Sequence, residues 1–367
     1  MINHALLPAL HAGHRTAFIP MYFLMQILGL NLSYAAETAG PGVVPTTAAA
    51  VEANADAVTK KRVLYIDSYD AGFEWVQGIT EGLLDGLNIQ SDMQGVLDQS
   101  KSPVQLKIIH LDTQRNSSLE SIRAAVIDAK ALISSWRPDI VIASDDNASK
   151  HLIAPYYKDS EIPFVFCGVN WDASEYGFPF SNVTGMIEVN LVPDLIKILR
   201  LNARGDRIGV LTIDRFTQRK DTEFMAQFFN LEVKSEYVRT FEEWKAAYVR
   251  MQQDVDMLIV GVVPDVEGWD DQEAERFVRE HARIPSGSWD RWMLPVALVG
   301  VVKSPQEQGR WAARTALEIL NGKSPSSIPI ATNTEAKVYL NMTLAREMGV
   351  KFPFNLIERS TLYHFRP

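Results

Sequence analysis

The feature that most constrains this chain is an alternation of short apolar runs and helix-period segments that begins at residue 61. Four runs in the first half are short and apolar enough to be buried strands: "RVLYID" (62–67), "VQLKIIHL" (104–111), "DIVIAS" (139–144) and "IPFVFCGV" (162–169). Segments with helical spacing of apolar residues separate them, as in "EWVQGITEGLLDGL" (74–87) and "SLESIRAAVIDAKALISSW" (118–136). This alternation predicts βαβ units, and therefore an α/β fold with parallel sheets.

The same alternation starts again after "NVTGM" (182–186), which we interpret as a crossover between two halves. We therefore expect two doubly wound parallel-sheet lobes joined by a hinge. The predicted first lobe is 61–184 plus 298–322, and the second is 185–297 plus 323–367. The chain is expected to cross between them near 184–187, 295–299 and 322–328. A last long helix, 304–322, is expected to have its apolar face at Trp311, Thr315, Leu317 and Leu320 and its carboxyl-terminal cap at Gly322.

The first thirty-five residues differ from the rest of the chain in charge and hydrophobicity. Arg15 is their only charged side chain, a long apolar run follows it, and Ser33-Tyr34-Ala35 fits a small-x-small cleavage pattern. We expect a signal peptide, 1–35, that is cleaved near Ala35; the alternative is an uncut membrane anchor. Residues 36–60 are rich in Ala, Pro and Thr and predict a disordered leader. An exported protein of the bacterial periplasm is the simplest interpretation.

The net charge and the cysteine content limit the classes of partner that this protein is expected to bind. The chain has a formal net charge of −9, which argues against nucleic acid or anionic lipid as the main partner. The single cysteine, Cys167, excludes an internal disulfide and lies far from the cleavage pattern, so no amino-terminal cysteine carries a lipid. We expect a monomer that binds a small molecule.

Candidate ligand-binding residues follow the predicted strands, because open parallel sheets bind ligands at the carboxyl ends of their strands. Polar and aromatic side chains occur at these positions and at a loop near the predicted hinge: Ser68, Tyr69, Asp70, Asp145, Asp146, Asn147, Asn170, Trp171, Asp214, Asp265, Trp289 and Asp290. For most of these aromatic residues, simple packing is the alternative interpretation. For Asp214, it is a local ion pair with Arg215.

The adjacent acids in "IVIASDDNASKHL" (140–152) raise a separate question. Neighbours in extended chain point to opposite faces, so Asp145 and Asp146 are a poor matched acid–base pair. One interpretation is that an acid caps the helix that starts near Asn147. The other is that an acid holds a ligand amine, since carboxylates at a helix amino terminus repel the anions that usually bind there. Together with Asp70, Asp265, Asp290 and the nearby aromatic residues, these acids predict a ligand with a positive group and an apolar or aromatic body.

Several stretches resemble a known family. "IPFVFCGVNW", "NVTGM", "NMTLAREMGVKFP" and above all "MLPVALVGVVKSPQEQGRWAARTALEILNGKSPSSIPI" resemble the ABC-transporter substrate-binding proteins related to tryptophan- and tyrosine-binding proteins. "YIDSYDAGFEWVQGITEGL" is similar to relatives encoded near sensor kinases. The resemblance covers roughly 61–367 and implies a type I periplasmic-binding-protein fold, whose lobes close on a small molecule without chemistry. Ser144-Asp145-Asp146-Asn147 departs from the small neutral residues usual there, such as Thr-Pro-Ala-Ala.

The expected function is therefore capture of a small molecule for an ABC permease. The first alternative is a ligand-sensing subunit for a membrane histidine kinase or a cyclic-dinucleotide signalling protein. The second is an exported hydrolase using Cys167 with His151, or using Ser68. Ser68 lacks the G-x-S-x-G elbow, no G-x-G-x-x-G or P-loop occurs, and the histidines lack ligand spacing. We therefore expect no catalysis, no cofactor and no metal.

Overall fold

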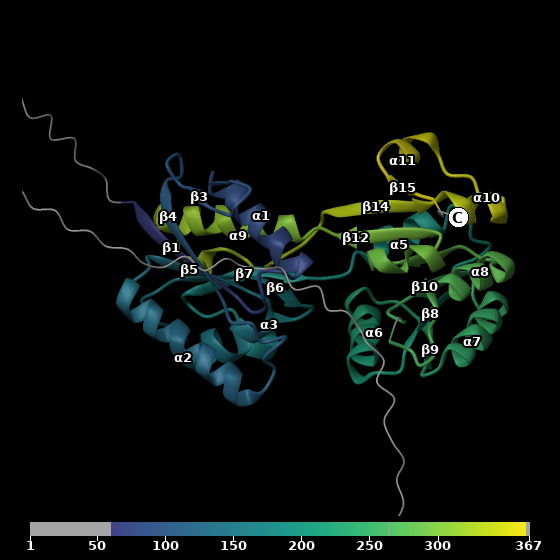
Figure 1. Cartoon of the computed structure of the whole chain (residues 1–367), viewed down its shortest axis with the longest axis horizontal. Coiled ribbons are helices and arrows are strands. Elements are labelled where there is room, and N and C mark those ends of the chain that lie inside the picture. Colours follow the sequence, from purple (N-terminus) through teal and green to yellow (C-terminus); the bar gives the residue numbers. More distant parts are fainter. Residues whose placement is uncertain (1–59, 264, 365–367) are drawn as a thin grey trace, which may run out of the picture. The chain divides into compact units, whose positions relative to one another are not determined.

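The computed structural model describes residues 60–263 and 265–364 (Figure 1). The predicted signal peptide, and the predicted leader apart from Lys60, lie outside the described residues. None of the described helices is both long enough and apolar enough to cross a membrane.

The first lobe is built on a six-stranded sheet in the order β13-β7-β6-β5-β1-β4. All of its neighbouring strands are parallel, as predicted. Its strands are β1 (Lys61–Asp67), β4 (Val104–His110), β5 (Ile140–Ser144), β6 (Phe164–Asn170), β7 (Val183–Glu188) and β13 (Ala331–Thr332). A small separate hairpin is formed by β2 (Gln90–Ser91) and β3 (Leu97–Asp98). The carboxyl ends of β1, β5, β6 and β7 therefore lie along one edge of this sheet.

Helices cover both faces of the first sheet (Figure 1). On one face lie α1 (Glu74–Gly86) and α9 (Pro305–Leu320); on the other lie α2 (Leu119–Trp136), α3 (Asp145–Ala148), η1 (Ser149–Ile153) and α4 (Ala154–Tyr156). Successive side chains of a strand point to opposite faces. Val63 and Tyr65 of β1 accordingly pack with α1 and α9, whereas Leu64 and Ile66 belong to the core that includes α2.

Helices α1 and α9 approach each other through glycines. A Cβ atom built on Gly309 of α9 would lie 1.9 Å from the carbonyl oxygen of Ile79, and one on Gly82 of α1 would lie 2.0 Å from that of Gln306. The buried face of α9 consists mainly of small residues: Gly309, Ala312, Ala313, Thr315 and Ala316. Trp311, Leu317 and Leu320 of the predicted apolar face are half-buried and pack at the margin of the core, while the closest contact uses small residues because the two backbones approach there. The expected end at Gly322 fits, since that residue has φ +100° just after the helix.

The second lobe contains a seven-stranded sheet in the order β15-β14-β12-β11-β10-β8-β9. Its strands are β8 (Ile208–Ile213), β9 (Val233–Val238), β10 (Met257–Val260), β11 (Ser286–Ser288), β12 (Val299–Lys303), β14 (Ala336–Asn341) and β15 (Thr361–Tyr363). Only the pairing of β14 with β12 is antiparallel among the described strands of this sheet. The sheet is thus mainly parallel, but β14 and β15 run opposite to its other described strands, a reversal that the sequence pattern did not predict.

The remaining helices belong mostly to this second lobe. They are α5 (Val192–Leu199), α6 (Phe216–Phe228), α7 (Phe241–Asp254), α8 (Asp271–His281), η3 (Arg291–Val296), α10 (Met342–Met348) and α11 (Phe354–Glu358), while η2 (Ala173–Tyr176) and η4 (Pro325–Ser327) follow strands or helices of the first lobe. Helix α7 begins with a capping box, in which Thr240 accepts a hydrogen bond from the Glu243 amide and the Glu243 side chain accepts one in return. This local sequence signal explains why α7 starts at Phe241.

Strand pairing moves the predicted lobe boundaries. All of β7, to Glu188, and β13 belong to the first sheet, although the sequence pattern assigns 185–188 and 323–333 to the second lobe. Conversely, β12 pairs with β11 and β14, so 298–303 belongs to the second sheet and not, as predicted, to the first lobe. An apolar run such as "VALVGVVK" fits either sheet, and only tertiary pairing decides between them.

Side chains fix the chain where it crosses between the sheets. The Asn333 side chain accepts a hydrogen bond from the Val189 amide (2.7 Å) and donates one to the Val189 carbonyl (3.1 Å). The buried Glu307 carboxylate accepts hydrogen bonds from the amides of Thr334 and Glu335. These bonds hold two crossing segments together and bring the ends of β7 and β12 to one region.

Candidate ligand-binding site

The carboxyl edge of the first sheet begins with a buried polar network at the end of β1. One carboxylate oxygen of Asp67 accepts hydrogen bonds from the hydroxyls of Tyr65 (2.6 Å) and Ser144 (2.8 Å), and the other accepts one from the Tyr69 amide (2.6 Å). Burial raises the pKa of Asp67, while these hydrogen bonds oppose the rise. Because its oxygens are already engaged, Asp67 shapes the strand ends rather than offering a free ligand group.

Asp145 is the most unusual residue of this edge. It is 2% exposed and has a backbone φ of +67°, a conformation in which Asp is among the better-tolerated residues. Its Oδ1 accepts a hydrogen bond from the indole nitrogen of Trp75 (3.0 Å), but its buried Oδ2 has no hydrogen-bond partner among the described residues. Burial, followed by the charges of Asp67 and Glu188, holds the pKa of Asp145 well above its ordinary value. A carboxyl group is therefore buried with one oxygen unsatisfied.

The carboxylate of Asp146, the next residue, has hydrogen-bond partners. It accepts hydrogen bonds from the side-chain amide of Asn170 (2.6 Å) and from the hydroxyl of Tyr176 (2.8 Å). Neither acid caps the following helix: the amide of Ala148 donates instead to the hydroxyl of Ser68 (2.8 Å). The capping interpretation of the two acids is therefore wrong, because a serine from the loop after β1 already provides the acceptor.

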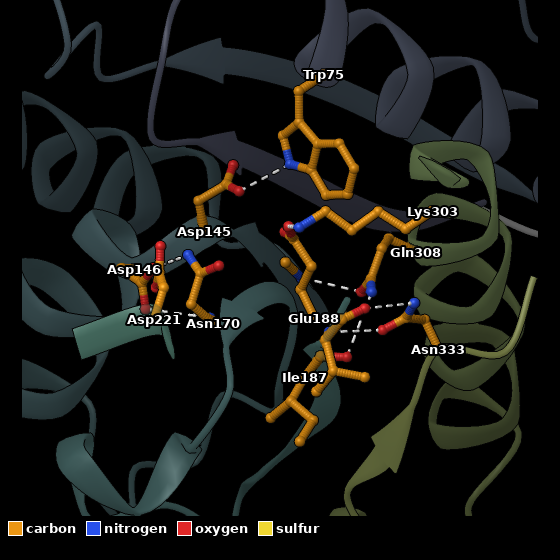
Figure 2. Close-up of polar contacts among 12 residues, drawn as sticks. Trp75, Asp145, Asp146, Asn170, Ile187, Glu188, Asp221, Lys303, Gln308 and Asn333 are labelled. Carbon is orange, nitrogen blue, oxygen red and sulfur yellow. Dashed lines mark hydrogen bonds and ion pairs between the residues drawn. The ribbon is translucent and has the colours of Figure 1, made fainter. Parts of the chain in front are cut away.

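Glu188 and Lys303 form an ion pair that the sequence analysis did not predict (Figure 2). Glu188 ends β7 of the first sheet, and Lys303 ends β12 of the second. The Lys303 ammonium also lies 5.5 Å from the ring centroid of Trp75. Burial raises the pKa of Glu188, and the positive charge of Lys303 opposes that rise. Both residues would have been found by the rule that ligand-binding side chains lie at the carboxyl ends of strands, which we call the strand-end rule, if it had been applied to "VTGMIE" and "VGVVK".

The second lobe contributes two further acids. Burial raises the pKa of Asp221, on α6, and the charge of Lys303 opposes this rise, as does a hydrogen bond with Trp171. Burial raises the pKa of Asp290, which follows β11, to about 6; Lys303 opposes this shift and Asp221 adds to it. The Oδ2 atom of Asp290 is buried and has no hydrogen-bond partner among the described residues. Asp221 was missed because it lies within a helix and not at a strand end.

Electrostatic interactions link five carboxyl groups, with Lys303 acting on Glu188, Asp221 and Asp290. We call the five the acidic cluster: Asp145, Asp146, Glu188, Asp221 and Asp290. Figure 2 shows four of them with Trp75 and Lys303. The predicted residues Asp145, Asp146 and Asp290 belong to this cluster. Asn170 supports it through its bond to Asp146.

Two predicted aromatic residues lie beside the cluster in different ways. Tyr69 is half-buried, and burial followed by the charges of Asp145 and Asp146 raises the pKa of its hydroxyl. Trp171 is only 6% exposed and packs edge-on against Phe228 (6.0 Å between centroids) and Phe229 (6.3 Å) of the second lobe. Tyr69 therefore remains a candidate wall of the site, whereas Trp171 packs between the lobes.

The other predicted residues have different partners. Asp214 forms ion pairs with Arg219 and Arg239 and not, as the alternative had it, with Arg215, which pairs with Asp265. Asp265 lines a groove on the second lobe with Trp292 and Tyr363, and none of the acidic cluster lines that groove. The remaining residues serve local structure: Asp70 faces Arg115 and the Gly72 amide, Asn147 donates to Thr113, Ser68 caps α3, and Trp289 is buried in the core.

Comparison with known proteins agrees with the fold and the resemblance. The family described as ABC transporter substrate-binding protein matches residues 63–362. A ligand-free, open substrate-binding protein with adhesive properties from Clostridium difficile is 17% identical, with a TM-score of 0.62 over 83% of this chain and 100% of that one. An ABC domain in complex with L-Trp from Streptococcus pneumoniae is 19% identical, with a TM-score of 0.50 over 84% of this chain and 100% of that one. No match was found among curated proteins.

Proposed function

Because the chain belongs to the ABC transporter substrate-binding protein family, we propose that it captures a small molecule bearing a positive group at the acidic cluster. The family match confirms the resemblance seen in the sequence, and it places the chain among binding proteins rather than enzymes. Proteins of this kind act outside the cytoplasm and pass a ligand to an ABC transporter. For this chain the proposed compartment is the periplasm, with the ligand held between the two lobes.

One observation carries the proposal: the buried Oδ2 of Asp145 has no hydrogen-bond partner among the described residues. An unsatisfied buried polar group costs about 1–3 kcal/mol, and more when it is charged. A ligand ammonium or guanidinium group supplies both the missing hydrogen bond and the missing positive charge. A charge-assisted hydrogen bond of this type contributes about 1.5–3 kcal/mol.

The charges around Asp145 favour a cation over an anion. Asp67 and Glu188 both raise its pKa, so the local field is negative. Lys303 is near, but its charge is already paired with Glu188. An anionic ligand at this position would meet carboxyl groups on several sides, whereas a cation would relieve their mutual repulsion.

The body of the ligand is expected to be apolar or aromatic. Trp75 and Tyr69 are both half-buried beside Asp145, with Trp75 oriented by its hydrogen bond to that residue. Aromatic faces bind apolar groups and also attract cations, an effect of about 0.5–2 kcal/mol. An amine attached to an apolar body uses both features.

Catalysis by Cys167 has no structural support. The thiol is fully buried in β6, and burial followed by the charge of Asp145 raises its pKa well above the ordinary value. A nucleophilic cysteine needs a depressed pKa, so this thiol is the inert kind. The Ser68 hydroxyl donates to the Ser144 carbonyl and accepts from an amide of α3, which assigns it to structure.

The test is calorimetric titration of the mature protein with amines identified by a thermal-shift screen of amines, amino acids, nucleosides and short carboxylates. A ligand that binds only the native state stabilises it by about 2.7 kcal/mol at a hundredfold excess over Kd. Asp145→Asn should weaken binding of the amine at least about tenfold, and Asp265→Asn, an exposed acid outside the cluster, should not. A ligand that is purely anionic, or equal affinity for wild type and Asp145→Asn, would refute the proposal.

A further inference from the structure

We propose that the ligand carries two positive groups, one at each end, which bind Asp145 of the first lobe and Asp290 of the second. The inference rests on the proposed function and extends it from a monocation to a dication. Its starting point is that unsatisfied carboxylate oxygens occur in both lobes at the same cluster.

In the described part of the chain, one carboxylate oxygen in each lobe is buried without a hydrogen-bond partner. Asp145 Oδ2 and Asp290 Oδ2 are both buried, and neither has a hydrogen-bond partner among the described residues. Asp145 follows β5 of the first sheet, and Asp290 follows β11 of the second. A ligand with one positive group would satisfy one of these oxygens and leave the other buried without a partner. A second positive group removes that remaining cost.

The protein's own cations do not fill this role. Lys303 acts on both Asp221 and Asp290, but it forms its ion pair with Glu188. Lys220 also acts on Asp221, and it forms its ion pair with Glu175 at 2.8 Å. Each of these lysines is therefore already neutralised by a glutamate. The acidic cluster keeps an excess of negative charge that a single positive ligand group does not balance.

The acids of the second lobe also disfavour a zwitterionic α-amino acid. If its amine bound Asp290, its adjacent carboxylate would meet the charge of Asp221, which already raises the pKa of Asp290. Like charges at such distances disfavour binding. Among the described residues, no group of three or more His, Cys, Asp or Glu side chains is placed to hold a metal ion. Two organic cations separated by an apolar chain fit better, because Trp75 lies between Asp145 and Lys303 and offers an apolar wall.

The experiment is calorimetric titration of the mature protein with straight-chain diaminoalkanes, from diaminopropane to diaminooctane. Each diamine is paired with the monoamine of the same chain length, and 6-aminohexanoate serves as a zwitterion of similar length. We expect at least one diamine to bind about tenfold or more tightly than its monoamine, and the zwitterion to bind more weakly than either.

Two variants test which carboxylate binds each positive group of the diamine. Asp290→Asn should weaken the diamine more than the monoamine and so remove the advantage of the diamine, whereas Asp145→Asn should weaken both. Asp265→Asn is the matched control and should change neither. Circular dichroism of each variant checks that it is folded.

The outcomes separate this inference from the proposed function. If monoamines bind through Asp145 and diamines gain nothing, or if Asp290→Asn leaves the diamine advantage intact, the two-charge inference is overturned and the proposed function stands. If neither class of amine binds the folded wild-type protein and a neutral or anionic compound does, both are overturned.

Discussion

The binding role proposed for the acidic cluster predicts that its unsatisfied carboxyl group lowers stability, which Asp145 and Asp146 allow to be tested side by side. In ligand-free protein at neutral pH, Asp145→Asn should raise the free energy of unfolding by about 1 kcal/mol or more, because it removes a buried carboxyl group that burial, Asp67 and Glu188 make costly to ionise. Asn tolerates the positive φ of this position, so the backbone is not strained.

Asp146→Asn should act in the opposite direction. It replaces an acceptor oxygen by a donor facing either Asn170 or Tyr176, which should lower the free energy of unfolding by about 1–2 kcal/mol. Urea unfolding of both variants measures the two effects. Equal and like-signed changes would contradict this contrast and would mean that both acids have the same structural role.

At the level of elements, the contact of α1 with α9 depends on glycine. Gly309→Ala places a methyl group 1.9 Å from the Ile79 carbonyl oxygen, and a backbone atom cannot rotate away as a side chain can. The helices must move apart, which should cost about 2 kcal/mol or more. Arg314→Ala, on the exposed side of the same helix, should change stability by less than about 0.5 kcal/mol. Thermal unfolding of both variants is the measurement, and a neutral Gly309→Ala would show that the helices repack without cost.

The elements also show how far the sequence could predict the site. Apolar runs predicted the strands, and the strand-end rule led to Asp145 and Asp146, while Asp290 was found in the loop near the predicted hinge. The rule missed Glu188, because the pattern of 182–186 indicates a crossover rather than a strand with an end of its own. It missed Lys303, because the sequence pattern assigns β12 to the wrong lobe. Asp221 lies inside α6 and no strand pattern points to it. Such residues come together through tertiary pairing, which one-dimensional periodicity does not contain.

For the whole molecule, ligand binding should be linked to pH. The pKa of Asp290, which lies within reach of Lys303 and Asp221, is about 6, and that of Asp145, facing Asp67, Asp146 and Glu188, is well above its usual range. Both values are raised, so these groups stabilise the ligand-free fold at low pH, and this contribution is lost as the pH rises through the folded-state pKa.

A bound cation favours the carboxylates, lowers both pKa values and releases protons. Affinity for a cationic ligand should therefore increase from about pH 5 to about pH 7. Titrations at one pH in buffers of different ionisation enthalpy measure the released protons directly. Net proton uptake on binding would be the opposite sign and would identify a ligand that needs a protonated carboxyl group.

The late position of α9 in the chain has a consequence for biosynthesis. Residues 305–320 are the partner of α1 and cover Val63 and Tyr65 of β1, yet more than two hundred residues separate them from that strand. While the chain is being made, the first sheet has one face only half covered until nearly all of the protein has left the ribosome. The first-lobe core therefore cannot close until most of the second lobe has also been made, and the growing polypeptide remains incompletely folded, the state in which a chain can still be threaded through a narrow translocation channel.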